Sequence, residues 1–147
     1  MYKRILVATN GSELSKKAVK AAVALAANVG AEMIALNVVP IYPTSYFRGA
    51  ITFSPTEIGQ VEKQWAERGQ AIADQARRVA DKSGVKCRPI TFHSDLVAEA
   101  ILRAVRKHKC DLVVMASHGR KGLKRLLLGS ETQHVLTHGD VPVLVLR

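Results

Sequence analysis

The sequence predicts an α/β domain built on one doubly wound, five-stranded parallel sheet, Rossmann-like, with helices on both faces. Short apolar, β-branched segments alternate along the chain with longer segments whose apolar residues recur at helical spacing. Strands separated by helices pair in parallel through right-handed crossovers. The 147 residues, 48% of them hydrophobic, can bury one core and are too few for two ordinary domains, so we expect residues 1–147 to form a single domain.

The first part of the chain predicts two strands and two helices. The first strand spans Arg4–Ala8, and Ser12 caps a helix that Gly30 ends. The second strand spans Met33–Val39. The stretch Ser54–Glu57 reads Ser-Pro-Thr-Glu, a capping box with proline at the first helical position, and it opens a long second helix.

An edge strand and a third helix follow. Gly84 is expected to end the long helix, and Val85–Phe92 forms the third strand. Pro89 cannot donate a hydrogen bond to a central ladder, so this strand belongs at an edge of the sheet. The third helix is indicated by apolar residues at helical spacing, namely Val97, Ile101, Ala104 and Val105.

The last part of the chain predicts a buried strand, a helix and a final strand. The run Asp111–Ala116 is short, apolar and β-branched, which is typical of a buried parallel strand. Ser130 and Gln133 fit a second capping box that places the start of the fourth helix, which ends near Gly139. The final strand spans Val141–Leu146.

The loop between the fourth strand and the fourth helix predicts a phosphate site. Residues 116–130 read ASHGRKGLKRLLLGS, with glycines at Gly119, Gly122 and Gly129 that let the main chain approach an anion. Ser130 opens a helix whose unpaired N–H groups and positive dipole end face that anion. The loop is neither a Walker loop nor a dinucleotide GxGxxG. The alternative is that these glycines only form turns.

From Lys3 to Arg147 the chain resembles the universal stress protein family. Members that bind ATP carry Gly, two residues, Gly, nine residues and then Gly-Ser or Gly-Thr. Gly119 matches the second glycine, nine residues intervene, and Gly129 with Ser130 closes the motif. Ala116 stands in place of the first glycine. Its methyl group is tolerable at strand dihedrals and obstructive where the backbone needs positive φ or approaches a phosphate closely.

The resemblance also implies the sheet order 3-2-1-4-5. This order places the ends of the first and fourth strands side by side and the Pro89 strand at an edge. In open α/β sheets, ligands bind beyond the carboxyl ends of the strands where the strand order reverses. The loop after the first strand should therefore face the glycine loop across a crevice.

The same resemblance implies roles for individual residues. Asn10 stands where ATP-binding members usually have Asp, so it keeps a carbonyl acceptor and loses the charge. The alternative is that Asn10 supplies a turn before Gly11. The main chain at Val38 resembles the adenine contact, and Met115 lines the way to the phosphates. The expected nucleotide-binding residues are Ala8, Thr9, Asn10, Val38, Met115, Ala116, Ser117, His118, Gly119, Arg120, Gly122, Gly129, Ser130, Glu131 and Thr132.

Glu131 matches a position where the family uses its backbone amide. Its carboxylate would repel a terminal phosphate unless it turned outward, and it also suits the positive end of a helix. The implied ligand is ATP, with or without Mg²⁺, and ADP or AMP are alternatives. A rival interpretation is a dimeric stress scaffold in which Ala116 and Asn10 have disabled nucleotide binding.

Catalysis finds little support in these residues. The two ligand loops offer no paired acids to activate water or to hold a metal. His118 could touch a phosphate, and the alternative is that it hydrogen-bonds the local backbone. His134 and His138 have the spacing of two zinc ligands and lack the third. We therefore expect a regulator in stress adaptation and no dedicated enzyme, with a weak nucleotide hydrolase as a further alternative and slow incidental ATPase activity left open.

Composition and charge predict the surroundings of the protein. No apolar run approaches the roughly 20 residues that a membrane span needs, and Cys87 and Cys110 have no metal-ligand spacing, so we expect free thiols in the cytoplasm. The net charge is +10, yet no basic stripe interleaved with aromatics is present, which disfavours nucleic-acid binding. The apolar strand Val141–Leu146 predicts a homodimer. The loop Pro40–Pro55 could close over the base or pack against a second subunit.

Overall fold

A computed structural model describes residues 1–41, 54–118 and 128–147 of the chain. Its five-stranded sheet has the order β3-β2-β1-β4-β5, and every adjacent pair of strands is parallel. The doubly wound α/β fold and the predicted strand order are therefore confirmed. In chain order the elements are β1 (Arg4–Ala8), α1 (Glu13–Val29), β2 (Glu32–Val39), α2 (Pro55–Asp81), β3 (Cys87–His93), α3 (Val97–His108), β4 (Leu112–Ala116), α4 (Ser130–His138) and β5 (Val143–Leu146).

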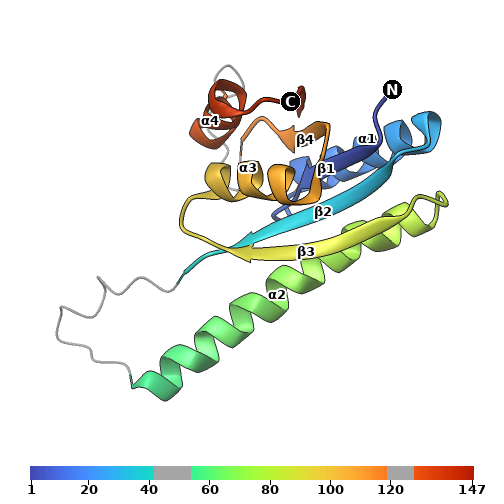
Figure 1. The fold of residues 1–147 in the computed structure, drawn as a ribbon. Helices are drawn as coiled ribbons and strands as arrows, with labels where there is room; N and C mark the ends of the chain where they lie inside the picture. The colour runs from blue at the N-terminus through green and yellow to red at the C-terminus, as the bar shows by residue number, and fades with distance from the viewer. Residues whose placement is uncertain (42–53, 119–127) are drawn as a thin grey trace.

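The sheet separates two hydrophobic cores. Successive side chains of a strand point to opposite faces, so Ile5 and Val7 pack under α1 and α2, whereas Leu6 packs under α3 and α4. All three side chains are fully buried, as expected for a central parallel strand that is covered on both faces. Figure 1 shows the same arrangement, with α3 in front of the strands and α1 behind them.

The predicted starts of α1 and α2 are confirmed by their caps. The Ser12 side chain accepts a hydrogen bond from the Ser15 amide, and Gly30 ends α1 at a left-handed φ of 71°. At α2, the Ser54 and Glu57 side chains bond each other's backbone amides in a reciprocal capping box. The expected end of α2 was displaced by a few residues. The helix stops at Asp81, and Gly84, with φ of 69°, forms the turn that follows it.

The capping box predicted for Ser130 and Gln133 is wrong. Gly129 is the N-cap of α4, Ser130 is its first helical residue, and no side chain caps this end. The Gln133 side chain instead donates to the Leu128 carbonyl at 2.9 Å. Gly129 occupies the cap because the chain passes close to β4 here: a Cβ on Gly129 would lie 3.2 Å from the Ser117 carbonyl oxygen.

The edge position of β3 explains how this strand can contain Pro89, which has no N–H to donate. The Lys86 carbonyl accepts from the Met33 amide and the Ser94 amide donates to the Val39 carbonyl, so these two residues direct their backbone groups toward β2. Backbone groups alternate sides along a strand, and Pro89 therefore faces away from β2, where its missing N–H removes no ladder bond. β3 and β5 are shorter than expected, since each begins two residues later than predicted.

α2 approaches the sheet closely only in its second half. Its buried residues are small and all lie in that half, namely Gly69, Ala73, Ala76 and Ala80. Figure 1 shows the first half of the helix running past the ends of the strands. Gly69 lies close to β2, because a Cβ there would lie 2.6 Å from Asn37 Oδ1 and from Val39 Cγ2.

Both cysteines are free and buried. Burial is the main cause that raises the pKa of the Cys87 thiol from 9.0 to about 11. Burial likewise raises the pKa of the Cys110 thiol from 9.0 to about 11. Both thiols are therefore protonated at neutral pH and are poor nucleophiles in the folded protein.

The raised thiol pKa values predict a loss of stability in alkali. Below pH 9 the thiols are protonated in the folded and unfolded chains alike; between pH 9 and about 11 only the unfolded chain ionises, so the free energy of unfolding falls as pH rises. Each thiol can lower the free energy of unfolding by at most about 1.4 kcal/mol for each pH unit in this range. Urea unfolding between pH 9 and about 11 measures the free energy of unfolding. This free energy should depend less on pH in the double variant Cys87→Ala with Cys110→Ala than in the parent, and an equal dependence would contradict the prediction.

Candidate functional site

The candidate site lies where β1 and β4 end side by side. β1 pairs with β2 on one side and with β4 on the other. After β1 the chain enters α1 on one face of the sheet, and after β4 it enters α4 on the opposite face. The loops that leave the two strands therefore diverge, which is the geometry of a ligand crevice at a topological switch point.

The β1 loop is held by a hydrogen bond to β2 and by a bond within the loop. Thr9 is buried, and its amide donates to the Leu36 carbonyl of β2 at 2.9 Å. The Asn10 Oδ1 atom accepts from the Ser12 amide at 2.9 Å, and Gly11 follows with a φ of 80°. This bond is an Asx turn, so Asn10 has the turn role considered above as an alternative to ligand contact. The loop is thus shaped before any ligand arrives.

Asn37 belongs to this site and was missed in the sequence. It is a buried amide on β2, only 6% exposed, and its Nδ2 donates to the Thr9 carbonyl at 2.9 Å. The available signal was a single amide side chain inside the apolar run Met33–Val39. A buried polar group needs a partner, and here the partner is the backbone of the candidate ligand loop. The neighbouring Val38 is partly buried on the α3 and α4 side of the sheet.

The end of β4 is tied to β5 and to the start of α4 by hydrogen bonds. The Ser117 amide donates to the Leu146 carbonyl at 2.7 Å, and the Ser117 carbonyl accepts from the Gly129 amide at 2.7 Å. The Thr132 hydroxyl, 1% exposed, lies 3.0 Å from the Ala116 carbonyl oxygen and 3.2 Å from that of Ser117. Ser117 and Thr132 therefore position the start of α4 as structural residues, a role that the motif did not indicate.

Ala116 has the strand conformation in which its methyl group is tolerated. It is the last residue of β4 and pairs with Leu146 of β5. Within the described ranges, Lys109 is the one non-glycine residue with positive φ. The backbone at Ala116 therefore does not require glycine. The His118 ring nitrogen Nδ1 lies 3.0 Å from Ser117 Oγ, so its local partner is a side chain and not the backbone that was the expected alternative to a phosphate.

The start of α4 presents amides that have no acceptor within the helix. The Gln133 amide makes the first bond of the helix, to the Gly129 carbonyl at 3.0 Å. The amides of Ser130, Glu131 and Thr132 precede that bond and have no acceptor within the helix. Together with the positive end of the helix dipole, these N–H groups form the part of the site that suits a phosphate. Ser130 is exposed at this end.

The Glu131 side chain serves a different helix. Its Oε2 accepts from the Ala98 amide at 2.8 Å and so caps α3, whose own N-cap residue Leu96 provides no side-chain bond. The positive end of α3 offsets the carboxylate charge. The Glu131 carboxylate was expected to repel a phosphate. Because it is bonded to the start of α3, this repulsion is weakened.

Removing this cap should destabilise the protein. Glu131→Ala leaves the start of α3 without its side-chain acceptor, and we expect the free energy of unfolding to fall by about 1 kcal/mol. Urea unfolding measures the change. Glu62→Ala, on the exposed face of α2, is the matched control and should stay within about 0.5 kcal/mol of the parent. Equal effects of the two substitutions would contradict the capping role.

Some expected site residues cannot be placed. Gly119, Arg120 and Gly122 lie outside the described residues, as does most of the loop Pro40–Pro55. The described ranges contain no cluster of three or more His, Cys, Asp or Glu side chains able to hold a metal ion. His134 and His138 stack with their ring centroids 4.1 Å apart. No helix within the same ranges is long and apolar enough to cross a membrane.

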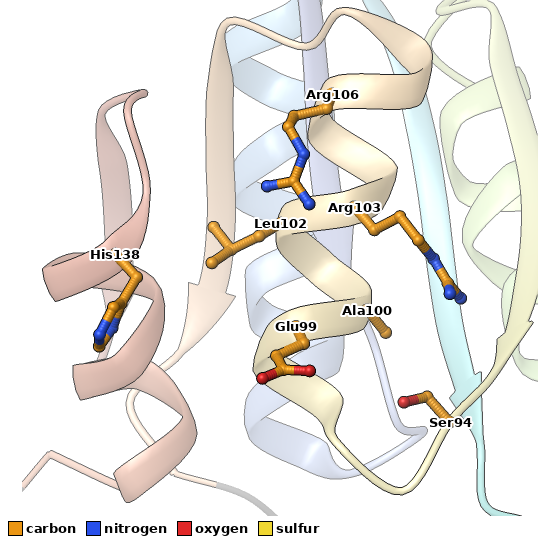
Figure 2. Close-up of a pocket in the computed structure, with 7 residues that line it drawn as sticks. All are labelled: Ser94, Glu99, Ala100, Leu102, Arg103, Arg106 and His138. Carbon is orange, nitrogen blue, oxygen red and sulfur yellow. The ribbon is translucent and has the colours of Figure 1, made fainter.

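Two cavities lie near the candidate site but do not include the start of α4. A cavity of about 190 Å³ lies between α1 and α2 and reaches Thr9 and Gly11 of the β1 loop. A larger one of about 370 Å³ lies against α3 and α4, lined by Ser94, Glu99, Ala100, Leu102, Arg103, Arg106 and His138 (Figure 2). Neither contains the start of α4 among its lining residues.

The fold defines a doubly wound α/β domain in which the loop after β1 and the start of α4 lie at the switch point of the sheet. The model of the universal stress protein family matches residues 1–147, and the chain belongs to this family. Universal stress protein YxiE of Bacillus subtilis is 32% identical over 149 residues, covering 100% of both chains. Universal stress protein MJ0531 of Methanocaldococcus jannaschii is 32% identical over 151 residues, covering 100% of this chain and 83% of the relative.

Solved structures agree with this assignment. The structure of MJ0577 from Methanocaldococcus jannaschii superposes with a TM-score of 0.82 at 26% identity, covering 99% of this chain and 96% of that one. A universal stress protein in complex with cAMP has a TM-score of 0.72 at 21% identity, with 99% and 97% covered. A family member from Arabidopsis thaliana with AMP bound has a TM-score of 0.69 at 17% identity, with 98% and 90% covered. At 21% and 17% identity, the last two similarities show a shared fold alone.

Proposed function

We propose that this universal stress protein binds an adenine nucleotide between the β1 loop, residues 8–11, and the start of α4. The observation that carries the proposal is the set of amides at Ser130, Glu131 and Thr132, which have no acceptor within α4 and lie at the end of β4, the strand that pairs with β1 at the switch point of the sheet. The phosphates would meet these amides, and the base would lie toward Val38. Structural neighbours that contain cAMP and AMP support the class of ligand.

The proposed ligand is ATP, with or without Mg²⁺, and ADP and AMP are the alternatives. A nucleotide that bridges the two loops would change the contacts of both. The protein would thus act in the cytoplasm as a nucleotide-responsive regulator in stress adaptation. We further propose a homodimer formed through β5, because this strand lies at an edge of the sheet and Leu144 is 41% exposed there.

Binding rather than turnover is the proposed activity. A hydrolase needs a base that can reach the attacking water. Glu131 is bonded to the start of α3, and His118 is bonded to Ser117, so each of these two side chains already has a local partner. These contacts favour a regulator over a weak nucleotide hydrolase.

Calorimetric titration of the nucleotide-stripped protein with ATP, with and without Mg²⁺, tests the proposal. The expected result is saturable micromolar binding of one nucleotide per chain, with competition by ADP and AMP and no release of product over the time of the titration. Absence of heat and of competition by any adenine nucleotide would instead support the dimeric scaffold. Multiple turnovers that depend on His118 would support the hydrolase.

A further inference from the structure

A basic surface lies where the edge strand β3 meets α3. We call it the α3–β3 surface and define it by Arg88, Phe92, Arg103 and Lys107. All three cations are exposed. Within the described part of the chain, none of them forms an ion pair with a carboxylate, whereas the nearby Glu32 pairs with both Arg4 and Lys86. The positive charge of the α3–β3 surface is therefore not neutralised by these parts of the chain.

Phe92 holds two of these cations in place. The Arg103 guanidinium carbon lies 4.8 Å from the centroid of the Phe92 ring, and the Lys107 ammonium nitrogen lies 5.5 Å from it. Both distances are typical of cation–π contacts. When the flat face of a guanidinium stacks on an aromatic ring, its N–H donors point outward from the stack. They can then form a bidentate pair with a carboxylate. The α3–β3 surface is thus organised before a partner arrives.

The electrostatic environment of His108 reflects the same concentration of charge. The pKa of His108 lies below its ordinary value because the ring is desolvated and because Lys107, Arg88 and Arg4 place positive charges near it. These residues come from α3, β3 and β1, so the positive potential extends across more than one element. Such a field attracts anionic partners and speeds their association.

The edge of β3 is unsuited to strand addition. Pro89 faces away from β2, as the alternation between Lys86 and Ser94 shows, and it presents no N–H in the middle of the free edge. An added strand would lose a hydrogen bond at this position. A partner at this edge would therefore be recognised by the side chains of the surface rather than by a continuous backbone ladder.

We propose that the α3–β3 surface binds an acidic segment of a partner protein. Asp and Glu side chains of that segment would pair with Arg88, Arg103 and Lys107. Arg106 offers a further contact from the cavity of about 370 Å³ against α3, where Glu99 is the one acidic residue among the described lining residues. Figure 2 shows Arg103 and Arg106 leaving α3 in different directions, so the helix presents cations along two sides.

The observations favour a peptide over a single-stranded nucleic acid. Proteins that bind single strands stack bases on open aromatic faces. The aromatic side chain of the α3–β3 surface is Phe92, and it already carries the Arg103 and Lys107 cations. A segment with several carboxylates needs no such face, since charge-assisted hydrogen bonds suffice.

Fluorescence anisotropy with a fluorescein-labelled, glutamate-rich peptide tests the proposal. The test variant carries Arg103→Gln with Lys107→Gln. The control carries Arg78→Gln with Lys82→Gln, which removes the same charge from the exposed end of α2. We expect the test variant to bind the peptide about tenfold more weakly and the control to change less than about twofold. Thermal melting checks that the test and control variants are folded. If the test variant does not fold, the single change Arg88→Gln at an exposed residue tests the surface instead.

Three results would overturn the proposal. Equal weakening by the test and control pairs would show that the peptide senses only net charge. Absence of saturable binding at low ionic strength would show that the surface does not accept an acidic segment. Tighter binding of a polyuridine oligonucleotide, with the same dependence on Arg103 and Lys107, would assign the surface to nucleic acid.

Discussion

Ser130→Asp is expected to weaken ATP binding at least about 100-fold while leaving the fold intact. The new carboxylate would stand at the first position of α4, where the amides that have no acceptor within the helix are proposed to meet the phosphates. Like charges would repel there. An acidic residue in the first helical turn also stabilises the helix, so the melting temperature should not fall. Calorimetric titration and thermal melting measure the two effects separately.

A matched control separates this effect from a general loss of positive charge. Gln60→Asp adds the same charge on the exposed first half of α2 and should leave ATP binding within about twofold of the parent. Gly129→Asp combined with Ser130→Asp should remove binding completely, because a Cβ on Gly129 would lie 3.3 Å from the His118 Cα. Parent-like ATP affinity of Ser130→Asp would show that α4 does not hold the phosphates.

Gly69→Ala is expected to lower the free energy of unfolding by about 2 kcal/mol, although alanine favours helix. The added Cβ would lie 2.6 Å from Asn37 Oδ1 and from Val39 Cγ2, so α2 or the strand must shift. Asn37 also holds the Thr9 carbonyl, which makes the β1 loop sensitive to the same substitution. Urea unfolding measures the stability.

Gly59→Ala on the same helix should have the opposite sign. A Cβ there has no heavy atom of the described chain within 4 Å, so the gain in helix propensity remains, about 0.5–1 kcal/mol of stabilisation. The pair thus compares one chemical change at a packed and at an open position. Stabilisation by both substitutions would contradict the close approach of α2 to β2.

The strand order and most helix starts could be predicted because their signals are local or come from the family pattern. Ser12 and Ser54 cap helices through bonds to residues three positions away, which a sequence window contains. Pro89 marks an edge because proline lacks an amide hydrogen, whatever surrounds it. The alternation of elements then leaves few topologies for a parallel sheet.

The start of α4 shows where local reasoning failed. Ser130 and Gln133 have the spacing of a capping box, but the close passage of Gly129 past Ser117 moves the cap one residue earlier. The bond from Ala98 to Glu131 joins residues 33 positions apart, and no periodicity encodes it. Asn37 is a similar case, because its role depends on β1 and β2 being neighbours.

The most direct test of nucleotide binding at this site is a titration of the isotope-labelled protein with ATP, followed by the backbone amide resonances. We expect saturable shifts that are largest at Thr9, Asn10, Ser130 and Glu131, and small at the exposed first half of α2. Saturable shifts confined to α3 and the cavity beside it would place the nucleotide elsewhere. No saturable shift at any amide would show that this universal stress protein does not bind ATP.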